Sequence, residues 1–204
     1  ENRHLYLRTL DQLEGTLLAG TEEAYSPFFS PDGQWVAFFT EKKLKKVSVL
    51  GGAPLTLCDA KQGGGDGTWG TDGTIVFALR KNGGLWRVPA VGGNAEELTK
   101  TDPKDKTAAH RWAQFLPNGD AVIYTSHDGN SGGYDEAIIE LLSLDNKQHK
   151  TLYRGGSYGR YVPSGNLVFV RGGTLFAAPF DFKRLVLTGP PPPVLQSVAF
   201  AAYM

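Results

Sequence analysis

Three short glycine patterns in this sequence have the residue types that carry chemistry in other proteins. Residues 65–70 read Gly-x-Gly-x-x-Gly, the dinucleotide pattern, and residues 129–133 and 155–159 read Gly-x-Ser-x-Gly around Ser131 and Ser157. A dinucleotide loop lies between a strand and a helix, and a nucleophilic serine of this pattern sits on a strand-to-helix turn. Here a turn and a strand follow the first pattern, Ser131 falls in a glycine-rich hairpin loop, and Ser157 precedes a strand. We therefore predict no catalytic residue and no cofactor.

The potential metal ligands are too scattered to predict a metal site. The four histidines are His4, His110, His127 and His149. No two of them have the spacing at which a single element binds a metal ion. Residues 128–136 are rich in oxygen ligands, but they lack the register and the closing glutamate of an EF-hand calcium loop. We expect a hairpin loop there and no bound metal.

Composition excludes several classes of protein. The chain has 204 residues, of which 41% are hydrophobic and 21% are charged, which is typical of a globular protein rather than a disordered one. Its 21 basic and 21 acidic residues give no net charge, whereas a protein that binds nucleic acid usually carries a basic excess. The single cysteine, Cys58, rules out an internal disulfide and a cysteine-based zinc site. We predict no nucleic-acid partner.

The two ends and the hydropathy pattern suggest a segment of a longer protein. The chain begins at Glu1, and its only methionine is Met204. No run of apolar residues is long enough to span a membrane, so we predict no direct membrane insertion of this segment.

A four-fold repeat organises the chain. Each copy has an aromatic residue, a tight turn that ends in glycine, and a run of β-branched and aromatic residues typical of a strand. The turn glycines are Gly33, Gly73, Gly119 and Gly165, and the aromatic residues four positions before them are Phe29, Trp69, Phe115 and Tyr161. The glycines are 40, 46 and 46 residues apart, a period that is typical of β-propeller blades.

We therefore predict an all-β fold, a β-propeller of four-stranded antiparallel blades with four complete blades and one partial or composite blade. The complete blades are expected at about 25–58, 65–99, 111–153 and 157–187, with a partial blade from 1–19 and 196–204. Residues 1–204 would then form a single propeller domain or a propeller fragment. The alternative is a two-sheet sandwich, which also uses many short strands but does not require the same aromatic residue in every unit.

The repeat also predicts which residues form the core. Phe29, Trp69, Phe115 and Tyr161 should be buried at equivalent places on the innermost strands, and Phe38, Phe77, Tyr124 and Phe169 on the next strands. The last strand, around 199–203, should share a blade with the strand at 5–7, which would protect the terminal strand edges.

Several stretches of the sequence resemble a known family. The run Ser-Pro-Asp-Gly-x-x-Val-Ala-Phe at 30–38 resembles the WD40-like Pro-Asp-Gly repeat of TolB-type propellers. The stretches SPFFSPDGQWVAFF, GTWGTDGTIVFA and HRWAQFLPNG are similar to the C-terminal sensor propeller of bacterial serine/threonine protein kinases. This resemblance implies a bacterial signalling protein with the propeller outside the cytoplasm, in the periplasm or at the cell surface, although a cytoplasmic location stays open. The chain itself contains no kinase motif.

The propeller alignment predicts a binding site at one end of the central channel. The first strand of each blade lines the channel, so the residues that enter those strands from different blades should converge. The ligand-binding residues predicted in this way are Tyr25, Asp66, His110, Arg111, Ser157 and Tyr158. Their ligand would be a small molecule, a protein or a peptide.

Two functional hypotheses follow. The main one is a non-catalytic sensor propeller that binds a ligand or a protein and is not an enzyme. The alternative is an enzyme, or the accessory propeller of an enzyme of lyase or peptidase type, with a site at the same rim.

Overall fold

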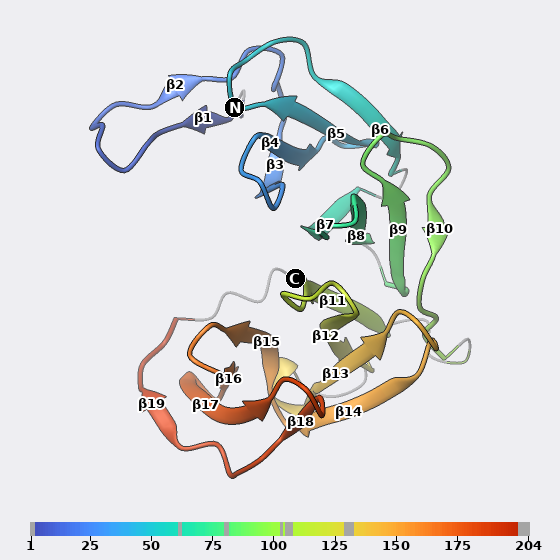
Figure 1. The fold of residues 1–204 in the computed structure, drawn as a ribbon, viewed down its shortest axis with the longest axis vertical. Coiled ribbons are helices and arrows are strands. Elements are labelled where there is room, and N and C mark those ends of the chain that lie inside the picture. The colour runs from blue at the N-terminus through green and yellow to red at the C-terminus, as the bar shows by residue number, and fades with distance from the viewer. Residues whose placement is uncertain are drawn as a thin grey trace. The chain divides into compact units, whose positions relative to one another are not determined.

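The computed structural model describes residues 3–60, 63–79, 82–102, 104, 108–128 and 133–199. The chain divides into two compact units, Glu1–Lys100 and Thr101–Met204, and each is described by itself. Both units consist of antiparallel β-sheets, drawn in Figure 1, and together they hold four sheets with four consecutive strands each. The fold is therefore a partial β-propeller. No helix in the described part of the chain is long and apolar enough to cross a membrane.

The first unit holds two of the four-stranded sheets and a short N-terminal hairpin. The hairpin consists of β1 (Tyr6–Leu7) and β2 (Thr16–Leu17). Sheet one consists of β3 (Tyr25–Phe29), β4 (Trp35–Phe39), β5 (Lys43–Ser48) and β6 (Leu55–Asp59). Sheet two consists of β7 (Gly64–Trp69), β8 (Thr74–Leu79), β9 (Leu85–Pro89) and β10 (Glu96–Glu97).

The second unit holds the other two sheets. Sheet three consists of β11 (Ala109–Phe115), β12 (Ala121–His127), β13 (Ile138–Ser143) and β14 (His149–Arg154), with a single 3-10 turn, η1 (Tyr134–Glu136), before β13. Sheet four consists of β15 (Ser157–Val162), β16 (Asn166–Arg171), β17 (Thr174–Asp181) and β18 (Val186–Leu187), and β19 (Pro193–Leu195) also pairs with β17. The closing strand predicted around 199–203 lies almost wholly outside the described residues.

The second-strand aromatic residues are buried as predicted. Phe38, Tyr124 and Phe169 are 0% exposed and Phe77 is 1% exposed. Phe39 of sheet one packs against Phe77 of sheet two, with ring centroids 5.9 Å apart. In the second unit the core between sheets three and four includes Phe169. Phe77 and Phe169 thus help to hold neighbouring sheets together, whereas Phe38 packs against the N-terminal segment.

The length of the first turn differs between sheets, and this difference keeps those rings in register. In sheet one the backbone N–H of Ser30 donates to Trp35 O at 2.9 Å, and the turn closed by this hydrogen bond contains four residues. In sheet two the N–H of Gly70 donates to Thr74 O at 2.8 Å, and the turn closed by this hydrogen bond contains three residues. Because side chains alternate along a strand, the aromatic residue comes one position later after the longer turn. Phe38 accordingly lies five residues after its turn glycine, whereas Phe77 lies four residues after its own.

The prediction of equal burial for the four first-strand aromatic residues is wrong. Phe115 is 9% exposed, Trp69 and Tyr161 are half-buried, and Phe29 is 57% exposed. Each of them lies at or next to the end of its innermost strand. Their burial therefore depends on what covers that end. Phe29 shares a sheet face with Val36, which the N-terminal segment covers through Leu18, but that cover leaves Phe29 in solvent.

Candidate functional site

A β-bulge interrupts each innermost strand near its start. The register with the second strand shifts between Tyr25 and Phe28, between Gly64 and Asp66, between Arg111 and Gln114, and between Ser157 and Arg160. Three of these bulges contain a non-glycine residue with positive φ, namely Ser26 at 47°, Trp112 at 54° and Tyr158 at 56°. Bulges redirect side chains and are common beside active sites, and strained backbone of this kind clusters at functional sites.

In the first unit the two predicted site residues lie at the junction of sheets one and two. The Tyr25 hydroxyl donates to Thr40 O at 3.1 Å and accepts from the Gly64 N–H at 3.2 Å, so it ties the start of β7 to sheet one. The Arg3 guanidinium lies 5.4 Å from the centroid of the Tyr25 ring. Asp66 is half-buried and follows directly after the bulge of β7. Tyr25 is thus committed to holding the two sheets together.

In the second unit two predicted site residues are buried. His110 is 6% exposed and Ser157 is 0% exposed. The His110 ring packs against the Tyr124 ring at a centroid distance of 4.9 Å. Burial lowers the pKa of His110 to about 4, helped by the nearby charges of His149 and Arg111, so the imidazole is neutral at pH 7. Neither side chain is open to a ligand arriving from solvent.

The structure brings two of the predicted residues, Arg111 and Tyr158, to the same end of β11 and β15. Arg111 pairs across the sheet with Thr125, and the Thr125 hydroxyl accepts a hydrogen bond from the Tyr158 N–H at 3.0 Å. Tyr158 is 41% exposed, so its ring is available to a ligand. That Arg111 and Tyr158 belong to the same binding site as Tyr25 and Asp66 stays a prediction.

Around Tyr158 the structure gathers rings that the predicted binding site did not include. The centroid of the Trp112 ring lies 5.6 Å from that of Tyr158 and 4.7 Å from that of Tyr134. The His127 ring lies 4.7 Å from the Tyr134 ring, and the Arg160 guanidinium lies 4.2 Å from the centroid of Tyr158. We refer to these five residues as the ring cluster. A cation over an aromatic face is attracted by the ring quadrupole, so Arg160 also orients Tyr158.

Hydrogen bonds between β11 and β15 hold the ring cluster in place. The Gln114 side-chain amide donates to Tyr161 O at 3.2 Å and accepts from Tyr161 N–H at 2.8 Å. The Arg160 guanidinium donates to the carbonyl oxygens of Trp112 and Gly159. These bonds lock the strands that carry Trp112 and Tyr158, so the two rings are positioned before a ligand arrives.

Trp112 had a signal in the sequence that our alignment did not use. It lies seven residues before its turn glycine, Gly119, just as Tyr158 lies seven residues before Gly165. Extending the alignment by one position would have found it. Tyr134 and Arg160 have no counterpart in the repeat, so no repeat signal identifies them.

A second group of polar side chains in sheet three, Tyr124, Glu140 and His149, stabilises the fold. The Tyr124 hydroxyl donates to Glu140 Oε2 at 2.6 Å and lies 2.8 Å from His149 Nδ1. Because the hydroxyl has one proton, the His149 nitrogen must donate to it. Burial, followed by the charge and the hydrogen bond of Glu140, raises the pKa of Tyr124, so the phenol stays protonated.

The pH dependence of stability tests the buried state of His110. A histidine whose pKa is lowered from 6.5 to about 4 binds fewer protons when folded, so stability falls as the pH drops through that window. We expect a loss of about 2 kcal/mol in the free energy of unfolding between pH 7.5 and pH 5. Urea unfolding at both pH values measures this loss. The His110→Asn variant should lack it, and an equal loss in that variant would show that His110 is not its source.

The described residues offer no obvious metal centre. Within them, no three His, Cys, Asp or Glu side chains lie close enough together to hold a metal ion. The Ser157 hydroxyl is buried, and the structure shows no hydrogen-bond partner for it. Ser131 lies outside the described residues.

Comparisons with solved structures find β-propellers. TolB from Acinetobacter baumannii is 19% identical, with 90% of this chain and 46% of that chain aligned and a TM-score of 0.65. The calcium-binding protein regucalcin from Agrobacterium tumefaciens is 15% identical over 86% of this chain and 60% of that one, with a TM-score of 0.66. A puromycin-hydrolysing peptidase from Mycobacterium tuberculosis is 12% identical over 88% of this chain and 30% of that one, with a TM-score of 0.61.

At such low identity these likenesses show the fold, and the chain spans 60% or less of the length of each of these proteins. A scan against protein-family models finds no match, and a search of curated proteins finds no significant relative. The resemblance to TolB-type propellers is confirmed at the level of the propeller fold.

The comparisons correct the functional prediction. Besides the peptidase, the similar propellers include a luciferin-regenerating enzyme and a gluconolactonase from Xanthomonas campestris. The main hypothesis, a non-catalytic sensor that is not an enzyme, is therefore wrong. The findings favour our alternative, an enzyme or the accessory propeller of an enzyme.

Proposed function

We propose that this chain is part of a propeller enzyme of hydrolase type, and that its ring cluster binds a ring-shaped substrate. The observation that carries the proposal is the ring cluster itself, in which Trp112 and Tyr158 stand on strained bulges of two neighbouring innermost strands. Propeller enzymes among the similar structures support the choice of an enzyme over a passive binding module.

The chemistry of the cluster suits a ring that carries a carbonyl or an anionic group. Aromatic faces stack on flat or sugar rings, and their two-angle side chains lose little entropy on binding. Arg111 and Arg160 add positive charge beside the rings, which favours an oxygen-rich substituent. His110 lies next to Arg111 but is buried, so we assign it a positioning role for the start of β11.

The remaining predicted site residues belong to the same proposal. In the first unit, Asp66 would contribute to ligand binding beside the bulge of β7, and Tyr25 would position the start of that strand. Ser157 would hold the strand on which Tyr158 stands. The partner at this site is then a small molecule.

The names of the similar enzymes supply two ring compounds as test substrates, glucono-1,5-lactone and puromycin. We expect the protein to hydrolyse one of them well above the uncatalysed rate. In the Trp112→Ala and Tyr158→Ala variants KM should rise about tenfold, because each loses roughly 1.4 kcal/mol of stacking with the bound ring, while kcat changes little. Initial rates over a range of substrate concentrations measure both constants.

The matched control is Tyr6→Ala, which removes another exposed tyrosine from β1 in the first unit. Its KM should equal that of the parent protein. Hydrolysis of neither compound, or an equal KM in the Tyr158 and Tyr6 variants, would contradict the proposal.

We also propose which kind of parent protein this chain belongs to and where it is located. The likeness to propellers attached to bacterial serine/threonine kinases concerns the parent protein, where this chain would be an accessory propeller outside the cytoplasm. A kinase domain and a membrane span encoded directly upstream would support it, and an uninterrupted propeller gene would not.

A further inference from the structure

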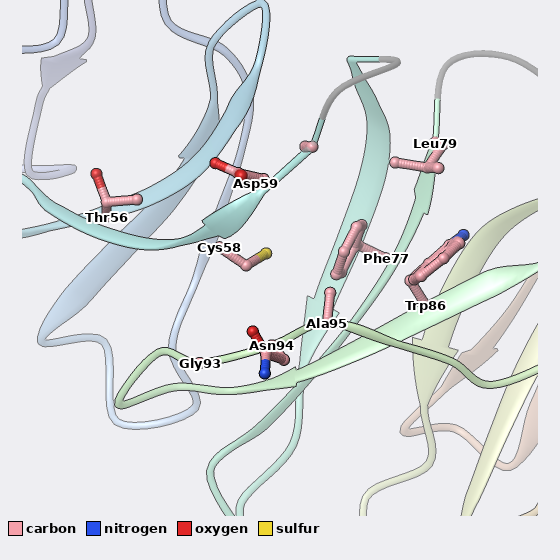
Figure 2. Close-up of a pocket in the computed structure, with 10 residues that line it drawn as sticks. Thr56, Cys58, Asp59, Phe77, Leu79, Trp86, Gly93, Asn94 and Ala95 are labelled. Atoms are coloured by element: carbon pink, nitrogen blue, oxygen red, sulfur yellow. The ribbon is translucent and has the colours of Figure 1, made fainter.

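A pocket of about 690 Å³ lies between sheets one and two of the first unit. Figure 2 shows it between the outermost strand of sheet one and the second and third strands of sheet two. It is lined by Thr56, Cys58, Asp59, Ala60, Phe77, Leu79, Trp86, Gly93, Asn94 and Ala95. The volume falls in the usual range for small-molecule sites, roughly 300–1,000 Å³.

One wall of the pocket is an apolar and aromatic surface of sheet two. Phe77 and Leu79 alternate along β8, and Trp86 pairs directly with Phe77 across to β9, so all three share one face of the sheet. Trp86 is half-buried, which leaves part of its ring to the pocket. On the other side, Figure 2 shows the Cys58 sulfur pointing across the pocket toward Phe77. Because Phe77 is 1% exposed, the parts of this wall that a ligand can reach are the half-buried Leu79 and Trp86 side chains.

The lower edge of the pocket is held by the backbone. The Gly93 N–H donates to Leu57 O at 2.9 Å, which fastens the loop before β10 to β6 of sheet one. Gly92 and Gly93 have positive φ, 92° and 146°, and a Cβ on Gly92 would lie only 3.1 Å from Leu57 O. Glycine is therefore needed for the close approach, and the pocket exists before a ligand binds.

Polar side chains lie at the edge of the pocket, and the Asp59 carboxylate among them can only accept hydrogen bonds. Asp59 and Asn94 are exposed, and each offers an oxygen to a ligand donor. Asp59 is the one charged residue among the described residues that line the pocket, with Lys43 opposite it on β5. An anionic ligand would meet the Asp59 carboxylate, whereas a neutral ligand with an N–H or O–H donor would not be repelled.

We propose that this pocket binds a neutral, flat aromatic molecule that carries one N–H or O–H donor. The half-buried Trp86 ring supplies the stacking surface, with the buried Phe77 ring beside it, and Asp59 or Asn94 accepts the hydrogen bond. The site is separate from the ring cluster and does not depend on the hydrolase proposal.

The first experiment uses N-phenyl-1-naphthylamine, a neutral fluorophore in which a single N–H donor joins a naphthalene and a phenyl ring. Its fluorescence should rise on binding to the protein with a Kd in the micromolar range. The anionic relative 1-anilinonaphthalene-8-sulfonate should bind at least about fivefold more weakly. In the Asp59→Asn variant the difference in affinity between the two dyes should be smaller. Equal affinity for the two dyes, unchanged in Asp59→Asn, would overturn the proposed selectivity.

Two tryptophan variants locate the binding of the neutral dye. Trp86→Ala should weaken binding about tenfold, because the stacking wall is lost. Trp35→Ala is the matched control, since Trp35 is also half-buried but lies on β4 at another edge of the first unit. Ala95→Trp, which fills the pocket from its loop, should weaken binding as well. An affinity equal to that of the parent in Trp86→Ala and Ala95→Trp would overturn the site.

Cys58 gives a second readout in the unchanged protein, because it is the only cysteine of the chain. Burial, with the Asp59 charge, raises the pKa of its thiol to about 11, so its reaction with a disulfide reagent should be slow. A dye concentration ten times the Kd should slow this reaction about tenfold, since a bound dye would block the approach to the buried sulfur from the pocket. Dye binding that leaves the labelling rate unchanged would place the dye elsewhere.

Discussion

Replacing Phe169 by alanine should lower the free energy of unfolding by about 3–5 kcal/mol, the usual cost of truncating a large buried aromatic residue. Phe169 is 0% exposed, and its ring lies 4.3 Å from that of Tyr153 and 5.7 Å from that of Phe176, measured between centroids. The neighbouring backbone approaches so closely that a Cβ on Gly156 would lie 2.8 Å from the ring. The surroundings therefore cannot collapse easily into the cavity. Urea unfolding followed by tryptophan fluorescence measures the loss.

Phe29→Ala is the matched control, since it removes the same atoms from a residue of the same repeat. Phe29 is 57% exposed, so its truncation should cost less than about 1 kcal/mol. A cost for Phe29→Ala as large as that for Phe169→Ala would mean that the end of β3 is covered and that the repeat is more regular than the structure shows.

The contrast between Phe169 and Phe29 shows how far the repeat predicts the fold. Turn glycines, with φ of 68° at Gly33 and 80° at Gly73, are fixed by local backbone chemistry, so the sequence reveals them directly. The second-strand rings follow because they lie in the middle of a sheet that is covered on both faces. Phe29 lies at a strand end, where burial depends on the distant N-terminal segment. The local sequence pattern therefore does not predict whether Phe29 is buried.

The candidate site was predicted less completely for a similar reason. The alignment selected positions such as His110 and Ser157 because it assumed regular strands, and both side chains are buried. The bulges shift the register by one residue, which leaves Tyr158 exposed and Trp112 half-buried. A bulge depends on pairing with the second strand, and this sequence has no glycine at either position to mark it.

The two sites differ in what holds them open. The ring cluster is held by side-chain hydrogen bonds between β11 and β15, in which Gln114 and Arg160 bind backbone groups. The pocket of the first unit is held by the close approach of glycine backbone to β6. A substitution of Gln114 should therefore loosen only the ring cluster, and dye binding next to Cys58 should be unaffected.

Gly84→Ala should be among the most damaging single substitutions in the first unit, with a loss of more than about 3 kcal/mol. An added Cβ would lie 1.7 Å from Thr99 O and 2.5 Å from Thr99 C, and backbone atoms cannot move aside as a flexible side chain can. Thr99 is 2% exposed, and its hydroxyl accepts a hydrogen bond from Leu85 N–H at 2.8 Å. Pushing Thr99 away would break that bond and detach the segment that follows β10.

Gly65→Ala is the control for this substitution, because a Cβ there would meet nothing closer than Leu79 O at 3.5 Å, an ordinary contact. Its free energy of unfolding should stay within about 0.5 kcal/mol of the parent value. Thermal and urea unfolding of both variants give the comparison. Equal stability of the two would mean that Thr99 does not pack against residue 84. A severe loss in Gly65→Ala would instead mean that the glycine pattern at 65–70 has a structural role that its open surroundings do not explain.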